Sequence, residues 1–286
     1  MKKRRRNLRL FPNSTKGNLM KLTVLCDNNT YIDKYYLGEP ALSFYIEDGD
    51  EKILFDTGYS YVFLDNAEKM GIDLGLVDTV VLSHGHNDHT RGLKYILPMK
   101  NTPLVAHPDC FNKKYESDGL YIGADYTLEE IKNLADYIDG THPRQLTENL
   151  WYLGQIERVT DFENKNPVGY ELINGEKRPD FLIDDTALAY KGKDGIFVIT
   201  GCSHSGICNI IEQAKRVCGD EKITGVIGGF HLFENNEQLK KTVEYFEKNG
   251  IKNNYPCHCV SLVAKAEMMA KLPLTEVGVS MTIEIE

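Results

Sequence analysis

One short segment, residues 83–89 with the sequence S-H-G-H-N-D-H, constrains this 286-residue chain more than any other feature. It places three imidazoles and one carboxylate close together, and each of these groups can bind a borderline cation such as zinc. Alternate residues of an extended segment point the same way, so His84 and His86 can share one metal ion while the next turn presents Asp88 and His89 to a second. Buried without partners, the same groups would be costly to desolvate. The segment therefore predicts a two-metal site.

The segment follows a β-branched run, residues 77–82, that is typical of a buried strand. Strand-like and helix-like patterns alternate on both sides of it. The strands are predicted near 22–25, 41–46, 52–55, 181–190, 195–200, 223–227 and 277–285, and the helices near 63–70, 128–135, 207–217, 239–250 and 261–272. Strand-rich halves with helices between them predict an α/β fold, a four-layer αββα sandwich. The histidine segment then lies at the carboxyl end of a strand.

The chain is expected to form one domain over residues 21–286, preceded by a flexible basic N-terminus at 1–20. The basic run Lys2–Arg6 fits a flexible end better than a membrane or nucleic-acid tether, because no apolar stretch follows it. Residues 149–179 are polar, rich in Asn and poorly periodic. We therefore expect residues 110–180 to be an insertion, or lid, over the site.

The net charge and the cysteine content limit which binding partners and which cellular compartment can be expected. A net charge of −9 disfavours general binding to nucleic acid or to anionic membranes, and no apolar run is long enough to span a bilayer. The seven cysteines are scattered through a chain that is large enough to need no disulfide staples, which indicates a reducing compartment, the cytoplasm. A small-molecule substrate is the expected partner, and a homo-oligomer is compatible with the sequence.

The sequence resembles the metallo-β-lactamase superfamily, whose signature is H-x-H-x-D-H preceded by a strand that ends in a D-T-G-like turn, here F-D-T-G at 55–58. The resemblance covers most of residues 22–285. Three more segments are similar to the subgroup related to 7,8-dihydropterin-6-methyl-4-(β-D-ribofuranosyl)aminobenzene 5′-phosphate synthase: T-G-C-S-H-S-G at 200–206, G-G-F-H-L at 228–232 and P-C-H-C at 256–259. The resemblance implies two divalent ions, Zn²⁺ with Mn²⁺ or Fe²⁺ as alternatives, and a substrate that is phosphorylated or pterin-like.

The resemblance leaves the ligand between the two metals open. The superfamily usually bridges its metals with an aspartate at the position that Cys202 occupies here. A thiolate at Cys202 can bind or bridge metal, or the side chain can fill space while His204, two residues on, supplies the ligand. Asp185 stands nearest in position to another superfamily histidine and is a further candidate metal ligand.

The remaining candidates follow later predicted strands. Either His231 or His258 can complete the second metal, and the subgroup favours His258 as the ligand and His231 as a ligand or a proton donor. The Cys257-x-Cys259 pair is interpreted as flanking the His258 turn, because a second paired motif for a separate zinc site is missing. Asp56 is expected to accept a hydrogen bond from the ring of a metal-binding histidine, and so to fix which ring nitrogen carries the hydrogen.

These features predict a metal-dependent hydrolase that activates water against a phosphoryl or carbonyl ester. Asp88 is the expected acceptor of the nucleophile's proton, and His231 the expected acid for the leaving group. One alternative is a diiron redox enzyme, although such relatives usually carry glutamate where His86 stands and no flavin-binding appendage is visible. A non-catalytic binding module is the other, and the intact segment at 83–89 argues against it.

Overall fold

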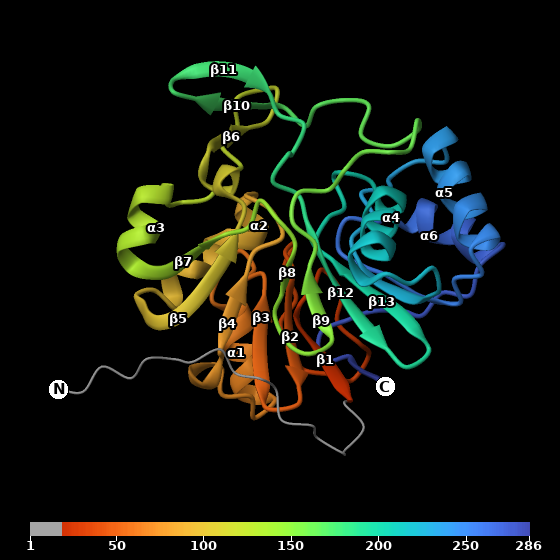
Figure 1. The fold of residues 1–286 in the computed structure, drawn as a ribbon, viewed down its shortest axis with the longest axis horizontal. Coiled ribbons are helices and arrows are strands. Elements are labelled where there is room, and N and C mark those ends of the chain that lie inside the picture. The colour runs from red at the N-terminus through yellow and green to blue at the C-terminus, as the bar shows by residue number, and fades with distance from the viewer. Residues whose placement is uncertain (1–18) are drawn as a thin grey trace.

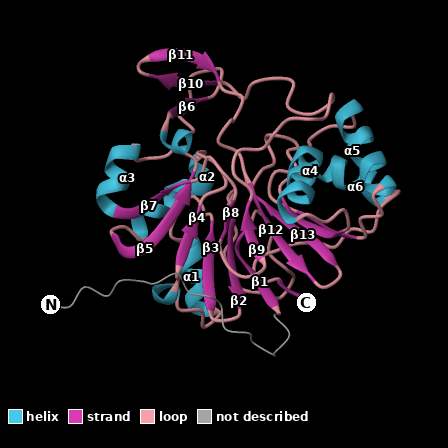
Figure 2. Ribbon diagram, in the orientation of Figure 1, coloured by secondary structure: helices cyan, strands magenta, loops and turns pink. Residues whose placement is uncertain are grey.

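A computed structural model describes residues 19–286 (Figure 1). The basic run Lys2–Arg6 lies outside the described residues. Two large sheets face each other, and helices pack on the outer side of each sheet (Figures 1 and 2). This arrangement confirms the predicted α/β class and is consistent with the four-layer αββα sandwich. In the part of the chain that is described, no helix is both long and apolar enough to cross a membrane.

The first sheet combines an antiparallel meander with parallel strands. Strand β1 begins at Met20, within the range assigned to the N-terminus. A turn at Gly49, where φ is +63°, joins β2 to β3, and β3, β4, β5 and β7 then run parallel. The order across the sheet is β16 (Thr282–Ile285), β1 (Met20–Cys26), β2 (Ser43–Asp48), β3 (Glu51–Phe55), β4 (Thr79–Val81), β5 (Met99–Ala106) and β7 (Ala135–Asp139).

The second sheet has parallel strands at one side, because helices connect them. Helix α4 (Ile207–Cys218) joins β13 to β14, and α5 (Glu237–Lys248) joins β14 to β15. Every residue of β13 is buried, as expected for a central parallel strand covered on both faces. The order is β15 (Asn253–Pro256), β14 (Ile223–Gly228), β13 (Gly195–Thr200), β12 (Ala187–Gly192), β9 (Leu150–Tyr152) and β8 (Arg144–Gln145).

Three apolar layers hold the sandwich together. Phe44 and Phe55 of the first sheet meet Tyr152 and Tyr190 of the second between the two sheets. Helices α4, α5 and α6 (Leu262–Met269) bury their apolar faces against the outside of the second sheet. The first sheet is covered by α1 (Val62–Lys69), α3 (Leu128–Leu134) and the short helices η1 (Leu74–Leu76), η2 (Arg91–Tyr95) and η3 (Pro108–Phe111).

Several boundaries differ from the sequence-based expectation, and the strand expected over 277–285 begins only at Thr282. The predicted capping box is confirmed, because Thr127 and Glu130 exchange hydrogen bonds at the start of α3, but the helix ends at Leu134 and the chain enters β7. The strand expected over 181–190 begins only at Ala187. The preceding Asp184 and Asp185 use their carboxylates to accept hydrogen bonds from other loops instead of pairing as a strand.

The range 110–180 divides into two kinds of structure. Strands β7, β8 and β9 extend the two large sheets. Strands β6 (Lys113–Tyr115), β10 (Tyr170–Ile173) and β11 (Glu176–Pro179) form a separate three-stranded sheet, which rises from the sandwich at the top of Figure 1. Only part of the range therefore stands outside the sandwich.

A buried lysine ties the small sheet to the histidine segment. Lys114 Nζ of β6 lies 2.9 Å from Asp180 Oδ2 and 3.0 Å from Asp184 Oδ1. Burial disfavours its charge, but the two carboxylates outweigh burial and raise the pKa of Lys114. The other oxygen of Asp184 accepts a hydrogen bond from the Gly85 amide at 2.7 Å. The position of residues 84–86 therefore depends on an ion pair behind them.

We expect Lys114→Met to lower the free energy of unfolding by about 3–5 kcal/mol, because it leaves two buried carboxylates without their cation. Denaturant titration measures the loss. Lys21→Met is the control: Lys21 pairs with Glu47 on the surface at 3.5 Å, so its loss should cost no more than about 1 kcal/mol. Equal, small losses in both variants would show that the Lys114 pair does not anchor the small sheet.

Candidate metal centre

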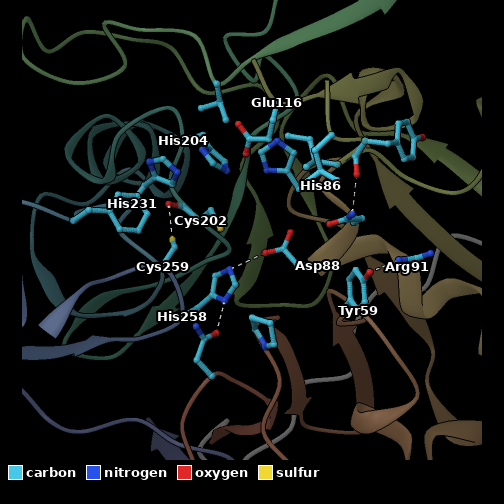
Figure 3. A pocket seen from close by; sticks show the side chains of 18 of the residues that line it. Tyr59, His86, Asp88, Arg91, Glu116, Cys202, His204, His231, His258 and Cys259 are labelled. Carbon is cyan, nitrogen blue, oxygen red and sulfur yellow. Dashed lines mark hydrogen bonds and ion pairs between the residues drawn. The ribbon is translucent and has the colours of Figure 1, made fainter. Parts of the chain in front are cut away.

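The metal-binding candidates come from loops that follow parallel strands in both sheets. Parallel strands end at the same edge of a sheet, so the side chains that follow them meet there. Figure 3 shows these side chains around one cleft, with His86 and Asp88 from the first half of the chain facing His204, His231 and His258 from the second. The contributing loops follow β3 (Asp56), β4 (residues 83–89), β13 (Cys202 and His204), β14 (His231) and β15 (His258).

Four of these strand-end residues have positive φ, which is uncommon outside glycine. The φ angles are 59° at Asp56, 57° at Ser203, 49° at His231 and 52° at His258. Each such residue costs about 1–3 kcal/mol unless its surroundings compensate for the strain, and strain of this kind gathers at functional sites. The concentration of strained turns at one edge marks this edge as the functional one.

One group of four donor atoms has the spacing of a tetrahedral zinc site. His89 Nε2 lies 3.2 Å from both His258 Nε2 and Cys202 Sγ, and Asp88 Oδ2 lies 3.2 Å from His258 Nε2 and 3.6 Å from His89 Nε2. Zinc bonds to nitrogen and sulfur imply tetrahedron edges of about 3.3–3.6 Å. The four donors are therefore spaced to surround one ion.

The tautomers of these two histidines favour a cation between them. His89 Nδ1 lies 2.7 Å from the Asp56 carboxylate and His258 Nδ1 lies 3.0 Å from Asn28 Oδ1, so each Nδ1 carries the hydrogen. Their Nε2 lone pairs then face each other at 3.2 Å. Burial lowers the pKa of His89, but Asp88 and Asp56 outweigh burial and raise it, so a positive charge, either a proton or a metal ion, is favoured between these two nitrogens.

A second group lies beside the first. Donor atoms of His84, Cys202 and His204 lie within 4.8 Å of one another, and His84 Nε2 is 3.1 Å from His86 Nδ1. The His204 ring stands edge-on to the His84 and His86 rings, at centroid distances of 4.7 and 4.8 Å. His86 Nε2 and both ring nitrogens of His204 are buried without a hydrogen-bond partner in the described part of the chain. Buried nitrogens without partners are costly, so these residues fit a metal ion.

Cys202 belongs to both groups. Its thiol therefore lies between the two sets of donors, at the position where the superfamily usually has a bridging aspartate. Burial raises the pKa of Cys202, and the neighbouring Cys259 adds to this effect. Cys257 packs between the two sheets while Cys259 lines the cleft, so the two thiols diverge and do not form a site together.

Asp56 lies behind both groups and is fully buried. Its Oδ2 accepts hydrogen bonds from His89 Nδ1 and from Ser83 Oγ, each at 2.7 Å, and its Oδ1 accepts from the Ser83 amide. Because the Ser83 hydroxyl donates to Asp56, it accepts from His84 Nδ1 at 2.9 Å. Asp56 thus leaves Nε2 of both His84 and His89 free to bind metal. A side chain at Gly201 would collide with Ser83 Oγ, since a Cβ there lies 2.2 Å from it.

Burial sets the protonation of the cluster. It lowers the pKa of His84 and His204, and it lowers the pKa of His86 to about 4. Burial alone would raise the pKa of Asp88, but the neighbouring His89 and His258 outweigh it and hold that pKa below its usual value. Near neutral pH these three imidazoles are therefore neutral and Asp88 is ionised, which are the forms that bind a cation.

Two predicted candidates lie outside both donor groups. Asp185 accepts hydrogen bonds from the Ser205 amide at 2.9 Å and from the Ser205 hydroxyl, so it contacts the residue that follows His204. Burial raises the pKa of Asp185 to about 6. The His231 ring packs 4.4 Å from the His204 ring and lines the cleft. Burial lowers the pKa of His231 to about 4.

The cleft in front of the donors measures about 750 Å³. Several residues that line this cleft were not predicted from the sequence. Arg91 lies over the Tyr59 ring, 4.7 Å from its centroid, and pairs with Asp125 at 3.1 Å. Glu116 and Tyr121 come from the loop after β6. Only Arg91 carried a signal in the sequence, because it lies two residues after the histidine segment.

We expect Asp56→Asn to weaken metal binding or activity about 10–100-fold, because an amide places an NH2 donor where one of the two carboxylate oxygens accepts hydrogen bonds, so it cannot serve the Ser83 amide, the Ser83 hydroxyl and His89 together. The measurement is metal affinity by competition with a chromogenic chelator. Asp48→Asn is the matched control, since Asp48 is also buried but bonds Thr147 in another part of the fold. Unchanged affinity in Asp56→Asn would contradict its role in setting the tautomers.

The sequence is similar to those of known proteins. A sequence model described as the Metallo-beta-lactamase superfamily matches residues 37–218. The chain is 32% identical over 276 residues to the 7,8-dihydropterin-6-methyl-4-(beta-D-ribofuranosyl)-aminobenzene-5'-phosphate synthase of Methanocaldococcus jannaschii, with 91% of this chain and 93% of that protein covered.

Solved structures show the same fold. The crystal structure of Tm1679, described as a metal-dependent hydrolase of the beta-lactamase superfamily, matches with a TM-score of 0.80 and 30% identity, covering 93% of this chain and 99% of that chain. Zn²⁺-bound PqqB from Methylobacterium extorquens shares the fold at a TM-score of 0.53 and 12% identity, covering 92% and 99%. The signature segment, the fold and these similarities lead to one conclusion: this chain belongs to the metallo-β-lactamase superfamily.

Proposed function

We propose that this chain is a metal-dependent hydrolase that holds two divalent ions and attacks a phosphoryl or carbonyl ester of a small molecule, by hydrolysis or a related transfer. The observation that carries the proposal is the convergence of buried donor atoms on two neighbouring points, with ring nitrogens of His86 and His204 left without partners among residues 19–286. Zn²⁺ is the proposed ion, because imidazole and thiolate donors suit it, with Mn²⁺ or Fe²⁺ as alternatives.

The proposed ligands divide between the two ions, with Cys202 between them. One ion is assigned to His84, His86 and His204, and the other to Asp88, His89 and His258. When bound, two such ions supply hydroxide near neutral pH and polarise the oxygen of the bond under attack. Asp56 supports both sets through His89 and Ser83.

Two residues of this chain are proposed to handle protons. Asp88 is ionised and lines the cleft, so besides binding metal it can accept the proton of the attacking nucleophile. His231 also lines the cleft, beside His204. Because burial lowers the pKa of His231 to about 4, its ring is neutral near neutral pH and acts as an acid only after it takes up a proton. Its ring N–H is proposed to donate a hydrogen bond to the leaving oxygen.

The proposed substrate is a phosphorylated or pterin-like molecule. The Methanocaldococcus jannaschii relative is named for a dihydropterin linked to a ribofuranosyl-aminobenzene phosphate. The cleft volume of about 750 Å³ falls in the range that holds small organic ligands. The diiron redox alternative is less well supported, because His86 stands where those relatives usually carry glutamate.

The test of this proposal is the metal content and turnover of His84→Ala. We expect the variant to lose one of two metal equivalents and nearly all hydrolysis on a panel of phosphodiesters and lactones, while its fold is retained because His84 lies in a strand-end loop. Plasma emission spectroscopy gives the metal content and circular dichroism checks the fold. His142→Ala is the control, since His142 is exposed and lies outside the cleft. Two metal equivalents and near-normal turnover in His84→Ala would overturn the two-metal proposal.

A second experiment separates the roles of Cys202 and His204. We expect His204→Ala to weaken metal binding more than Cys202→Ser, because His204 has two unpartnered ring nitrogens and Ser keeps a donor at position 202. Metal affinities of the two variants provide the comparison. Cys218→Ser, at the end of α4, controls for the loss of a buried thiol. The reverse ranking would assign the bridging role to Cys202.

A further inference from the structure

The Glu116 carboxylate is a cleft-lining group that the proposed metal chemistry does not use. Glu116 is half-buried and lines the cleft together with His86 and His204. Figure 3 shows its carboxylate directed into the cleft on the side of these two histidines. Among residues 19–286, this carboxylate has neither a hydrogen bond nor an ion pair. It belongs to neither group of metal-donor atoms.

The other charged groups of the cleft wall already have partners. Arg91 is paired with Asp125 and stacked on Tyr59. Asp88 contacts His89 and His258. No other lysine or arginine lines the cleft within the described residues, so the cleft itself offers Glu116 no cation. A bound molecule that carries N–H donors can therefore take the place of water at the Glu116 carboxylate.

The loop that carries Glu116 is fixed at both ends against the histidine segment. At one end, buried Lys114 reaches Gly85 through Asp184. At the other end, the Asn87 amide donates to Ile122 O at 2.8 Å, and Gly123 forms a β-bridge with His86. Within the loop, the Glu116 amide donates to Leu120 O at 2.9 Å. Glu116 is thus held at a set position relative to the proposed metals, as recognition of a substrate requires.

The wall around Glu116 is apolar and aromatic. Leu120, Tyr121, Ile122 and Val168 line the same part of the cleft. The Tyr121 hydroxyl donates to Ala124 O, so the tyrosine is held in place by a hydrogen bond. A carboxylate set in such a wall suits a flat heterocycle that packs on the apolar side chains and points N–H donors at the carboxylate.

We propose that Glu116 determines substrate specificity by accepting two parallel hydrogen bonds from a 2-aminopyrimidin-4-one edge, the ring N–H and the exocyclic amino group of a pterin. This inference rests on the proposed function, which places a pterin-like substrate in this cleft. A carboxylate matches two adjacent donors with its two oxygens, and such charge-assisted pairs are stronger than neutral ones. Glu116 contacts the ring, and the phosphoryl or carbonyl group is left to the metal side of the cleft.

The experiment measures binding of pterin and of lumazine to metal-loaded protein by calorimetry. Lumazine carries a carbonyl in place of the 2-amino group and lacks two adjacent donors. The protein should prefer pterin by at least about tenfold, and Glu116→Gln, which replaces one acceptor oxygen by a donor, should remove the preference. Glu68→Gln, an exposed carboxylate on α1, should keep it. Guanosine carries the same pair of N–H donors on a purine ring. Comparing its affinity with that of pterin therefore shows whether the donor edge comes from a purine or from a pteridine.

The readouts separate this inference from the proposed function. Two metal equivalents and hydrolysis of generic esters test the function, whereas the ratio of pterin to lumazine affinity tests Glu116. No preference in the parent protein, or an unchanged preference in Glu116→Gln, overturns the inference even if metal content and hydrolysis are normal. A loss of turnover in Glu116→Gln with the preference intact also overturns it, because that result assigns Glu116 to proton transfer.

Discussion

The arrangement of the candidate metal ligands depends on the buried carboxylate of Asp56. It receives hydrogen bonds from His89 directly and from His84 through the Ser83 hydroxyl, and so it sets one histidine of each donor group. Both histidines then present Nε2 to the other donors of their groups. Two backbone features allow this arrangement: Asp56 has a positive φ, and the glycine at position 201 leaves room for the Ser83 side chain.

A second buried charge network supports the same loop from the other side. Lys114 holds Asp184, and Asp184 accepts a hydrogen bond from the Gly85 amide, which lies between His84 and His86 of the second donor group. This network also anchors β6 and the loop that carries Glu116. The proposed substrate wall and the candidate metal ligands are therefore positioned by one set of contacts, so a change in Lys114 acts on both.

The sequence predicts the parts of the site that are local. Residues 83–89 contain four donors in one short segment, and the donors at 202, 204 and 258 lie in short motifs after predicted strands. Lys114 carries no such signal, because its partners Asp180 and Asp184 follow 66 and 70 residues later. The pairing of a single buried lysine with distant carboxylates is a property of the tertiary structure.

The same distinction holds for the fold. The long periodic helices and the buried strand β13 follow from their apolar patterns. Strands β7 and β9 are short and lie in irregular sequence. They form because β7 pairs with β5 at the edge of the first sheet and β9 pairs with β12 and β8 in the second. The strand expected over 181–190 starts late because Asp184 and Asp185 bond to the metal-binding loops.

The most direct test of the two-metal account is a crystal structure of the purified protein with anomalous diffraction recorded at the zinc edge. The account predicts two anomalous peaks about 3.5–4 Å apart. One should lie among His84, His86 and His204 and the other among Asp88, His89 and His258, with Cys202 Sγ between them. A single peak, or peaks away from these donors, would contradict it.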